Sequence, residues 1–180
     1  MAINFETLKN SLYSWAVANV PSGMPVVYYF PNAPRPTVDY VSLLLSTLEQ
    51  IGWDFRPEPE NDDGDVEQVG DRELVVQIQA YGGQVFNVLE NLRTSLQKVT
   101  VLDSLRANGI VFVSWYPIQD ITDLIDSRFE QRASMDVRFR LANVYDDVLG
   151  TIAQVELEEV VLNVDGSTVI DETVLIPPTL

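Results

Sequence analysis

Residues 132–141 read Arg-Ala-Ser-Met-Asp-Val-Arg-Phe-Arg-Leu, and apolar and polar side chains alternate there without a break. Successive side chains of a β-strand point to opposite faces of its sheet, so the alternation predicts a strand. One face carries Ala133, Met135, Val137, Phe139 and Leu141, and the other carries Arg132, Arg138 and Arg140 with Ser134 and Asp136. The three arginines are expected to pair with acids of the same sheet or with an adjacent subunit, and the pattern leaves both open.

Four other segments are also predicted to be strands. Residues 25–30 and 110–115 are short apolar runs, the second typical of a buried strand. Over 72–81 the apolar positions alternate at Leu74, Val76, Ile78 and Ala80. Over 40–53 they alternate at Val41, Leu43 and Leu45, followed by Thr47. The leucines of 40–53 also permit a helix, but the prolines before it and Gly52 favour extended structure.

Helical periodicity appears in three places. Asn4 is a suitable N-cap for the first helix, and its apolar face comprises Phe5, Leu8, Leu12, Trp15 and Ala16. A second helix is predicted over about residues 84–98. A short third one over 101–108 ends at Gly109, a residue type that favours helix C-termini. Trp15 is expected to be a core residue.

Three prolines stand close together in Pro31-Asn-Ala-Pro-Arg-Pro36. Proline fixes its own φ and biases the preceding residue toward extended geometry, so residues 31–36 are predicted to form a rigid, extended crossing. It is either a stiff connection between two strands or a fixed arm that contacts a neighbouring subunit. In the second case Pro31, Pro34, Arg35 and Pro36 are interface residues.

The C-terminal part is predicted to form a β-hairpin over 155–176. Its turn contains Asp165-Gly166, a favoured tight-turn pair, between two apolar segments. A lone hairpin is marginally stable in water, so this one is expected to dock on its own sheet or on a neighbour. Its candidate contact residues are Val160, Leu162, Ile170 and Val174.

Acidic residues gather in segments that invite a metal-site hypothesis. Residues 56–71 combine Asp, Glu, Pro and Gly, which predicts a solvated loop. An EF-hand with Gly64 at its sixth position would begin at Pro59 and end at Gly70, so that pattern fails. Asp120, Asp123 and Asp126 recur within 116–127, a predicted loop or short helix. On a helix they would share a face that could bind a metal, but a solvated face is favoured, and no cofactor is expected.

Composition narrows the function further. The 180 residues suit one domain. They contain no Cys and no His, so thiol nucleophiles, cysteine metal sites, the usual general base near neutral pH and the commonest metal ligand are missing. The net charge is −16, with nine acids against two arginines over 54–73 and eight acids without a base over 141–180. This balance disfavours gripping of nucleic acid, which needs a basic surface. No apolar run approaches the roughly 20 residues of a membrane span.

The order of landmarks along the chain resembles that of the phage neck and tail-terminator proteins. The residues that carry the resemblance are Trp15, the Pro31-to-Pro36 spacing followed by Asp39-Tyr40, Gln79-Ala80-Tyr81-Gly82, and the run from Glu130 to Phe139. The resemblance covers roughly residues 5–155. The acidic segment and the C-terminal hairpin look like elaborations without a place in the family pattern.

The resemblance implies an α+β fold in a single domain over residues 1–180. The expected fold is a mixed, mainly antiparallel sheet with two or three helices packed on one face, plus the C-terminal hairpin. It also implies a ring of six copies that caps the tail tube, ends tube polymerisation and joins the tail to the head-side connector. DNA would pass through the lumen without specific binding, and Asp62, Asp63 and Asp65 are the candidates to face it.

The resemblance also sets the expected partners and location. The partners are further copies of the chain, the tail tube protein and a connector or neck protein, and the tail sheath stays open as another. The protein is expected in the virion tail or neck after assembly in the host cytoplasm, with no enzymatic activity and no membrane contact. The alternatives are a tube or connector subunit, an acidic DNA-mimicking inhibitor, and an enzyme that binds a metal through Asp120, Asp123 and Asp126.

Overall fold

In a computed structural model of the protein, residues 3–29, 34–57, 65–125, 128–148, 155–162 and 168–176 are described. The chain divides into two compact units. The first comprises Met1–Pro57 with Gln68–Tyr145, and the second Glu58–Glu67 with Asp146–Leu180. The first unit holds the helices and the hydrophobic core, and the second holds the C-terminal hairpin.

The main sheet has six strands in the order β1-β2-β3-β8-β4, with β5 also paired to β8. Their bounds are β1 Val26–Tyr28, β2 Tyr40–Phe55, β3 Asp65–Tyr81, β4 Ile110–Trp115, β5 Gln119–Asp120 and β8 Arg132–Val148. β1 runs parallel to β2, whereas β2 pairs antiparallel with β3, and β4 and β5 pair antiparallel with β8. The mixed, mainly antiparallel sheet confirms the predicted α+β class.

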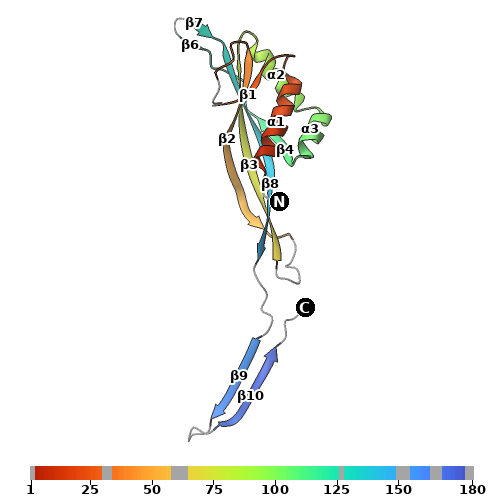
Figure 1. Cartoon of the computed structure of the whole chain (residues 1–180), viewed down its shortest axis with the longest axis vertical. Helices are drawn as coiled ribbons and strands as arrows, with labels where there is room; N and C mark the ends of the chain where they lie inside the picture. Colours follow the sequence, from red (N-terminus) through yellow and green to blue (C-terminus); the bar gives the residue numbers. More distant parts are fainter. Residues whose placement is uncertain are drawn as a thin grey trace. The chain divides into compact units, whose positions relative to one another are not determined.

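Three helices cover one side of this sheet, as Figure 1 shows. They are α1 Phe5–Asn19, α2 Val85–Ser95 and α3 Val99–Arg106. Asn4 caps α1 as predicted, because its side-chain oxygen accepts hydrogen bonds from the backbone N–H groups of Glu6 at 3.0 Å and Thr7 at 3.1 Å. Phe5, assigned above to the apolar face, is instead exposed.

The core lies between the helices and the sheet. The alternation over 132–141 is confirmed, because the five apolar residues of that stretch are all buried. Phe139 meets Trp15 edge-on, with ring centroids 6.3 Å apart. The indole N–H of Trp15 donates a hydrogen bond of 2.9 Å to Ser95 Oγ on α2, which satisfies its one polar atom inside the core. Trp15 is therefore a core residue that ties α1 to α2.

The prediction that residues 56–71 form a loop is wrong for the last part of this segment. Residues 65–71 belong to β3, where Asp71 lies opposite Ile51 and Val69 opposite Phe55 of β2. Gly70 and Asp71 suggested a turn, but the ion pair between Asp54 and Arg72 fills the space where a side chain at position 70 would stand. A contact between two strands thus overrides the local turn signal.

The predicted loop or short helix over 116–127 is also corrected. Gln119–Asp120 is strand β5, and Asp123–Ile125 forms strand β6, which pairs with β7 Arg128–Glu130. The Asp120 carboxylate accepts a hydrogen bond of 2.8 Å from the backbone N–H of Thr122, so it stabilises the bend between the two strands.

The C-terminal hairpin is confirmed as a separate two-stranded sheet. β9 Val155–Leu162 and β10 Thr168–Ile176 pair antiparallel, from Val155 opposite Ile176 to Leu162 opposite Thr168. The register sets Glu159 directly opposite Glu172.

Candidate functional site

Two tyrosines stack at one end of the main sheet. Tyr40 of β2 and Tyr81 of β3 are cross-strand partners, and their rings lie parallel with centroids 4.4 Å apart. The guanidinium of Arg35 lies 5.4 Å from the ring centroid of Tyr40 and 5.1 Å from that of Tyr81. The guanidinium of Arg132 lies 5.2 Å from the ring centroid of Tyr81. The aromatic pair therefore attracts two cations through the electrostatics of its ring faces.

One carboxylate binds both arginines. Arg35 pairs with Glu130 Oε1, and Arg132 pairs with Oε2 of the same group. Glu130 ends β7 and Arg132 begins β8, whereas Arg35 comes from the proline-spaced segment. The bridge thus attaches that segment to the sheet. We call Arg35, Tyr40, Tyr81, Glu130 and Arg132 the Arg–Tyr cluster.

A glycine turn borders the Arg–Tyr cluster. The Asp39 carboxylate accepts a hydrogen bond of 3.0 Å from the backbone N–H of Gly83, and the N–H of Gly82 donates to the carbonyl of Gln131 at 3.1 Å. Gly82 has φ +117°, and a Cβ atom there would overlap the Asp39 carboxyl group. Only glycine fits this position, since a side chain would be strained and would displace Asp39.

Tyr81 extends the site along the sheet through a chain of polar side chains. Its hydroxyl donates a hydrogen bond of 2.6 Å to Gln79 Oε1, and Gln79 Nε2 donates one of 2.9 Å to Gln77 Oε1. Burial is the main cause that raises the pKa of the Tyr81 hydroxyl above its usual value. The hydroxyl therefore stays protonated at neutral pH and acts as a hydrogen-bond donor.

The segments that carried the family resemblance meet at this site. Arg35 comes from the proline-spaced segment, Asp39 and Tyr40 from the next landmark, Gln79 to Gly82 from the third, and Glu130 to Arg132 from the fourth. Sequence reasoning named all four segments but missed that they converge, because local patterns contain no sign of the Tyr40–Tyr81 register. Trp15 lies apart from them, in the core.

The arginine face of β8 pairs with acids of β3. Arg138 Nε donates a hydrogen bond of 2.8 Å to Glu73 Oε1. Arg140 forms two longer ion pairs, from Nη1 to Asp71 Oδ2 at 3.5 Å and from Nε to Glu73 Oε2 at 3.6 Å. The side chain of Glu73 is only 7% exposed, so the two arginines supply the partners that a carboxyl group removed from water needs. Of the two pairings considered for the arginines, the one within the sheet is present. Their role at a subunit interface stays a prediction.

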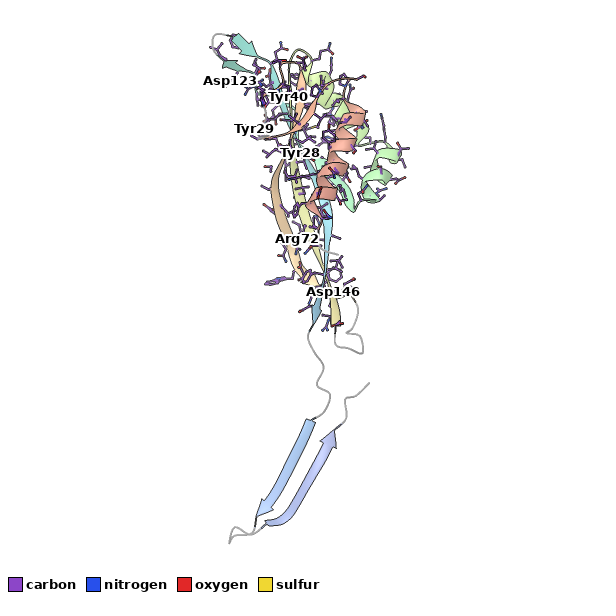
Figure 2. All side chains as sticks on the ribbon, in the orientation of Figure 1. Tyr28, Tyr29, Tyr40, Arg72, Asp123 and Asp146 are labelled. Atoms are coloured by element: carbon purple, nitrogen blue, oxygen red, sulfur yellow. The ribbon has the colours of Figure 1, made fainter. Side chains whose placement is uncertain are left out.

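A third cluster surrounds Asp54. Its partner Arg72 lies toward the end of the sheet opposite to Tyr40, as the labels in Figure 2 show. Arg72 donates two hydrogen bonds to the Asp54 carboxylate, at 2.7 and 2.8 Å. Gln50 Nε2 and the Tyr145 hydroxyl add one each, both at 3.0 Å. The contact between the guanidinium and the carboxylate is bidentate, and this ion pair joins β2 to β3.

Acid is expected to weaken the Asp54 cluster. Hydrogen bonding to Arg72 holds the pKa of the Asp54 carboxyl below its usual value. Such a carboxylate stabilises the fold above its unfolded pKa of about 3.9, and this stabilisation is lost as the pH falls through the lower, folded pKa. Asp54→Asn should therefore lower the free energy of unfolding near neutral pH, and the difference from wild type should shrink toward about pH 3. Urea unfolding at both pH values measures this.

The control is Asp103→Asn. Asp103 pairs with Arg106 at 3.1 Å, but both side chains are more than half exposed, so the change should have little effect at either pH. A difference between wild type and Asp54→Asn that stays constant with pH would rule out the ion pair as its source.

The other candidate residues are placed as follows. Pro34 and Pro36 lie beside Arg35, whereas Pro31, Asp62 and Asp63 fall outside the described residues. Asp65 is the first residue of β3, Val160 and Leu162 are on β9, and Ile170 and Val174 are on β10. Their roles at an interface or a lumen stay predictions.

The metal hypothesis loses its geometric basis. Asp120 and Asp123 lie on short strands and not on one helix face, and Asp126 is outside the described residues. Among the residues that the structure describes, no group of three or more acidic side chains is arranged to hold a metal ion. None of the described helices has the length and apolar character needed to cross a bilayer.

Comparison with known proteins assigns the family. The sequence model of the family described as "phage neck terminator protein" matches residues 6–172, which extends beyond the expected residue 155 into β10. No curated protein matches the chain. A solved structure, the sheath/tube terminator of the PVC extracellular contractile injection system in its extended state, resembles the fold with a TM-score of 0.51 at 10% identity. That match covers 86% of this chain and 62% of the other. The chain thus belongs to the phage neck terminator protein family and is a structural protein of a bacteriophage virion.

Proposed function

We propose that six copies of the chain close into a ring that caps the phage tail tube, ends tube polymerisation and joins the tail to the head-side connector. The observation that carries this proposal is the family match over residues 6–172. The fold supports it, because a terminator of a contractile injection system shares it. The tail tube protein and a connector or neck protein are the proposed partners, with the tail sheath as a third, and assembly takes place in the host cytoplasm.

The sheet offers edges through which copies can associate. β1 pairs only with residues 41–43 of β2, so among the described strands none covers the outer side of residues 46–55. β4 forms the opposite end of the strand order. An exposed edge can accept a strand from another chain, and the hairpin β9–β10 is a separate two-stranded sheet that is marginal alone. We infer that the hairpin and the proline-spaced segment contribute to contacts with neighbours.

The charge of the chain suits a channel for DNA. A net charge of −16 repels phosphates, so a ring of such subunits would not retain the DNA that passes through it. Asp62, Asp63 and Asp65 remain the proposed lumen residues. A ring structure in which these three residues lie far from the lumen would remove this assignment.

Electron microscopy of the purified protein tests the ring. Closed six-fold rings are expected, whereas continuous tubes or twelve-fold rings would indicate a tube or connector subunit. Mass spectrometry of purified virions should detect the chain. A protein that stays monomeric at every concentration and is missing from virions would refute the proposed function.

Removing residues 155–180 is expected to prevent ring formation and tail capping while the rest of the chain stays folded. The buried core residues that the structure describes lie within residues 8–141, so the truncated chain retains every one of them. Circular dichroism and urea unfolding verify the fold, and class averages count the rings. Six-fold rings and viable particles from the truncated chain would show that the hairpin is dispensable.

A further inference from the structure

The outer border of β2 is bare over its second half. β1 pairs with residues 41–43 alone, and among the described strands none lies beside residues 46–55 on that side. Figure 1 shows β2 along this border of the main sheet. An edge strand presents unpaired backbone N–H and C=O groups, which are a template for one more strand. The chemistry of this border therefore fits an extended polypeptide segment, and we call residues 46–55 the β2 edge.

The β2 edge contains a longer regular stretch than the opposite border of the sheet. Residues 47–51 pair with β3 one by one, without a register shift. At the opposite border, the register of β4 with β8 shifts after Phe112, so the regular part there is only Ile110–Phe112. A bulge bends a strand and disrupts its pairing. An added strand can thus follow residues 47–51 over a length that β4 does not offer.

Large apolar side chains along the β2 edge are exposed. Leu48 is 41% exposed, Phe55 55% and Trp53 94%. Trp53 is the most exposed of the large apolar residues that the structure describes. Large apolar groups exposed together mark contact sites. A strand that pairs with β2 would bring its own side chains beside them and remove apolar surface from water.

The hairpin β9–β10 supplies strands of the length that the β2 edge requires. β9 and β10 have 8 and 9 residues, whereas β6 and β7, the other two-stranded sheet, have 3 each. Within one chain, β9 and β10 form a sheet of their own, separate from the main sheet. Two strands alone are marginally stable in water, and a third paired strand stabilises such a ribbon. The hairpin and the β2 edge therefore lack the same thing, a neighbouring strand.

The distribution of charge favours a first unit, and not a second hairpin, as the partner of the hairpin. Of the 27 acidic residues of the chain, 14 lie in the second unit, which contains no lysine or arginine. The first unit contains the other 13 together with all 11 basic residues. Two second units therefore repel each other strongly, whereas a second unit and a first unit repel each other little. At the β2 edge, Arg72 binds Asp54 and so compensates its charge.

We propose that one strand of the hairpin of each copy pairs with residues 47–51 of β2 in the next copy. This inference rests on the proposed ring and names the contact that builds it. Backbone hydrogen bonds supply the pairing, and the added strand covers Leu48 and the aromatic residues that follow it. The contact joins two different surfaces, so its repetition from copy to copy closes a ring when the rotation permits.

Disulfide scanning tests the pairing, and the absence of cysteine from the chain removes background reactions. Glu49→Cys, in the middle of 47–51, is mixed and oxidised with single cysteine variants at successive positions of β9 and of β10. A heterodimer should form at every second position of one of these strands and much less between them, because successive side chains of a strand point to opposite faces. Thr47→Cys should shift the coupling positions by two residues.

The matched control is Val111→Cys. Val111 is 44% exposed on β4, at the opposite border of the sheet, so it should couple to none of the hairpin variants. A chain that carries Glu49→Cys and the best coupling hairpin substitution should give a ladder of sizes that ends in a closed ring. An internal disulfide in a monomer would show that the hairpin pairs with its own β2, and coupling to Val111→Cys would place it on β4. Either result overturns the inference.

Electron microscopy of the wild type, recorded in parallel, separates this contact from the ring itself. If six-fold rings form but neither Glu49→Cys nor Thr47→Cys couples to any hairpin position, the inference is wrong and the ring stands. Alternating coupling between copies without six-fold rings supports the contact and refutes the hexamer. Monomers without any coupling refute both.

Discussion

Replacing Phe139 by alanine is expected to lower the free energy of unfolding by about 3–5 kcal/mol. Phe139 is fully buried on β8 and meets two other aromatic rings, Trp15 and Phe112, each with its centroid at 6.3 Å. The truncation removes apolar contact area and leaves a cavity in the middle of the core, which the surrounding strands can close only in part. Urea unfolding at neutral pH measures the loss.

The matched control for Phe139→Ala is Trp53→Ala. It also truncates an aromatic residue in a strand, but Trp53 is 94% exposed, so stability should change by no more than about 0.5 kcal/mol. A loss below about 1 kcal/mol for Phe139→Ala would mean that the core does not centre on β8.

Replacing Gly82 by alanine is expected to cost about 2–4 kcal/mol of stability and to disrupt the Arg–Tyr cluster. At φ +117° the alanine is strained, and its Cβ atom overlaps the carboxyl group of Asp39. Asp39 must move and lose its hydrogen bond to Gly83, next to the stacked tyrosines. Urea unfolding reports the cost, and ring formation reports the effect on assembly.

Gly83→Ala is the control for Gly82→Ala. A Cβ atom at position 83 meets no other atom within 4 Å, and Gly83 is not among the glycines with positive φ. The neighbouring substitution should therefore change stability by less than about 0.5 kcal/mol. Equal effects at the two positions would show that the Asp39 contact does not determine the conformation of the turn.

Sequence patterns predicted the elements whose signal is local and strong. The alternation over 132–141 specified both the strand and its buried face, because every second residue of a half-buried strand must be apolar. The two apolar segments of the C-terminal part were likewise predicted as paired strands, and β9 and β10 pair antiparallel, whereas the predicted turn Asp165-Gly166 falls outside the described residues. The sequence did not predict that β3 begins at Asp65, because Gly70 and Asp71 resemble turn residues. The ion pair between Asp54 and Arg72 joins two strands beside Gly70, and a local pattern cannot reveal such a contact.

The candidate site was predictable only in parts. The resemblance drew attention to the segments around Arg35, Tyr40, Tyr81 and Glu130, but it attached no contact to any of them. Their meeting depends on the register of β2 with β3 and on a bridge between Arg35 and Glu130, two residues 95 positions apart. Periodicity and turn signals act over a few residues, so they contain no information about such a bridge.

The late position of β8 in the chain has a consequence for biosynthesis. β8 lies between β3 and β4 in the sheet, and it contributes Phe139 to the centre of the core. While the ribosome has yet to release residues 132–148, the nascent polypeptide cannot complete this sheet. Folding must therefore wait until most of the chain has been translated, and pairing between distant strands is slow in any case. Unfinished chains are consequently unable to occupy a growing tail.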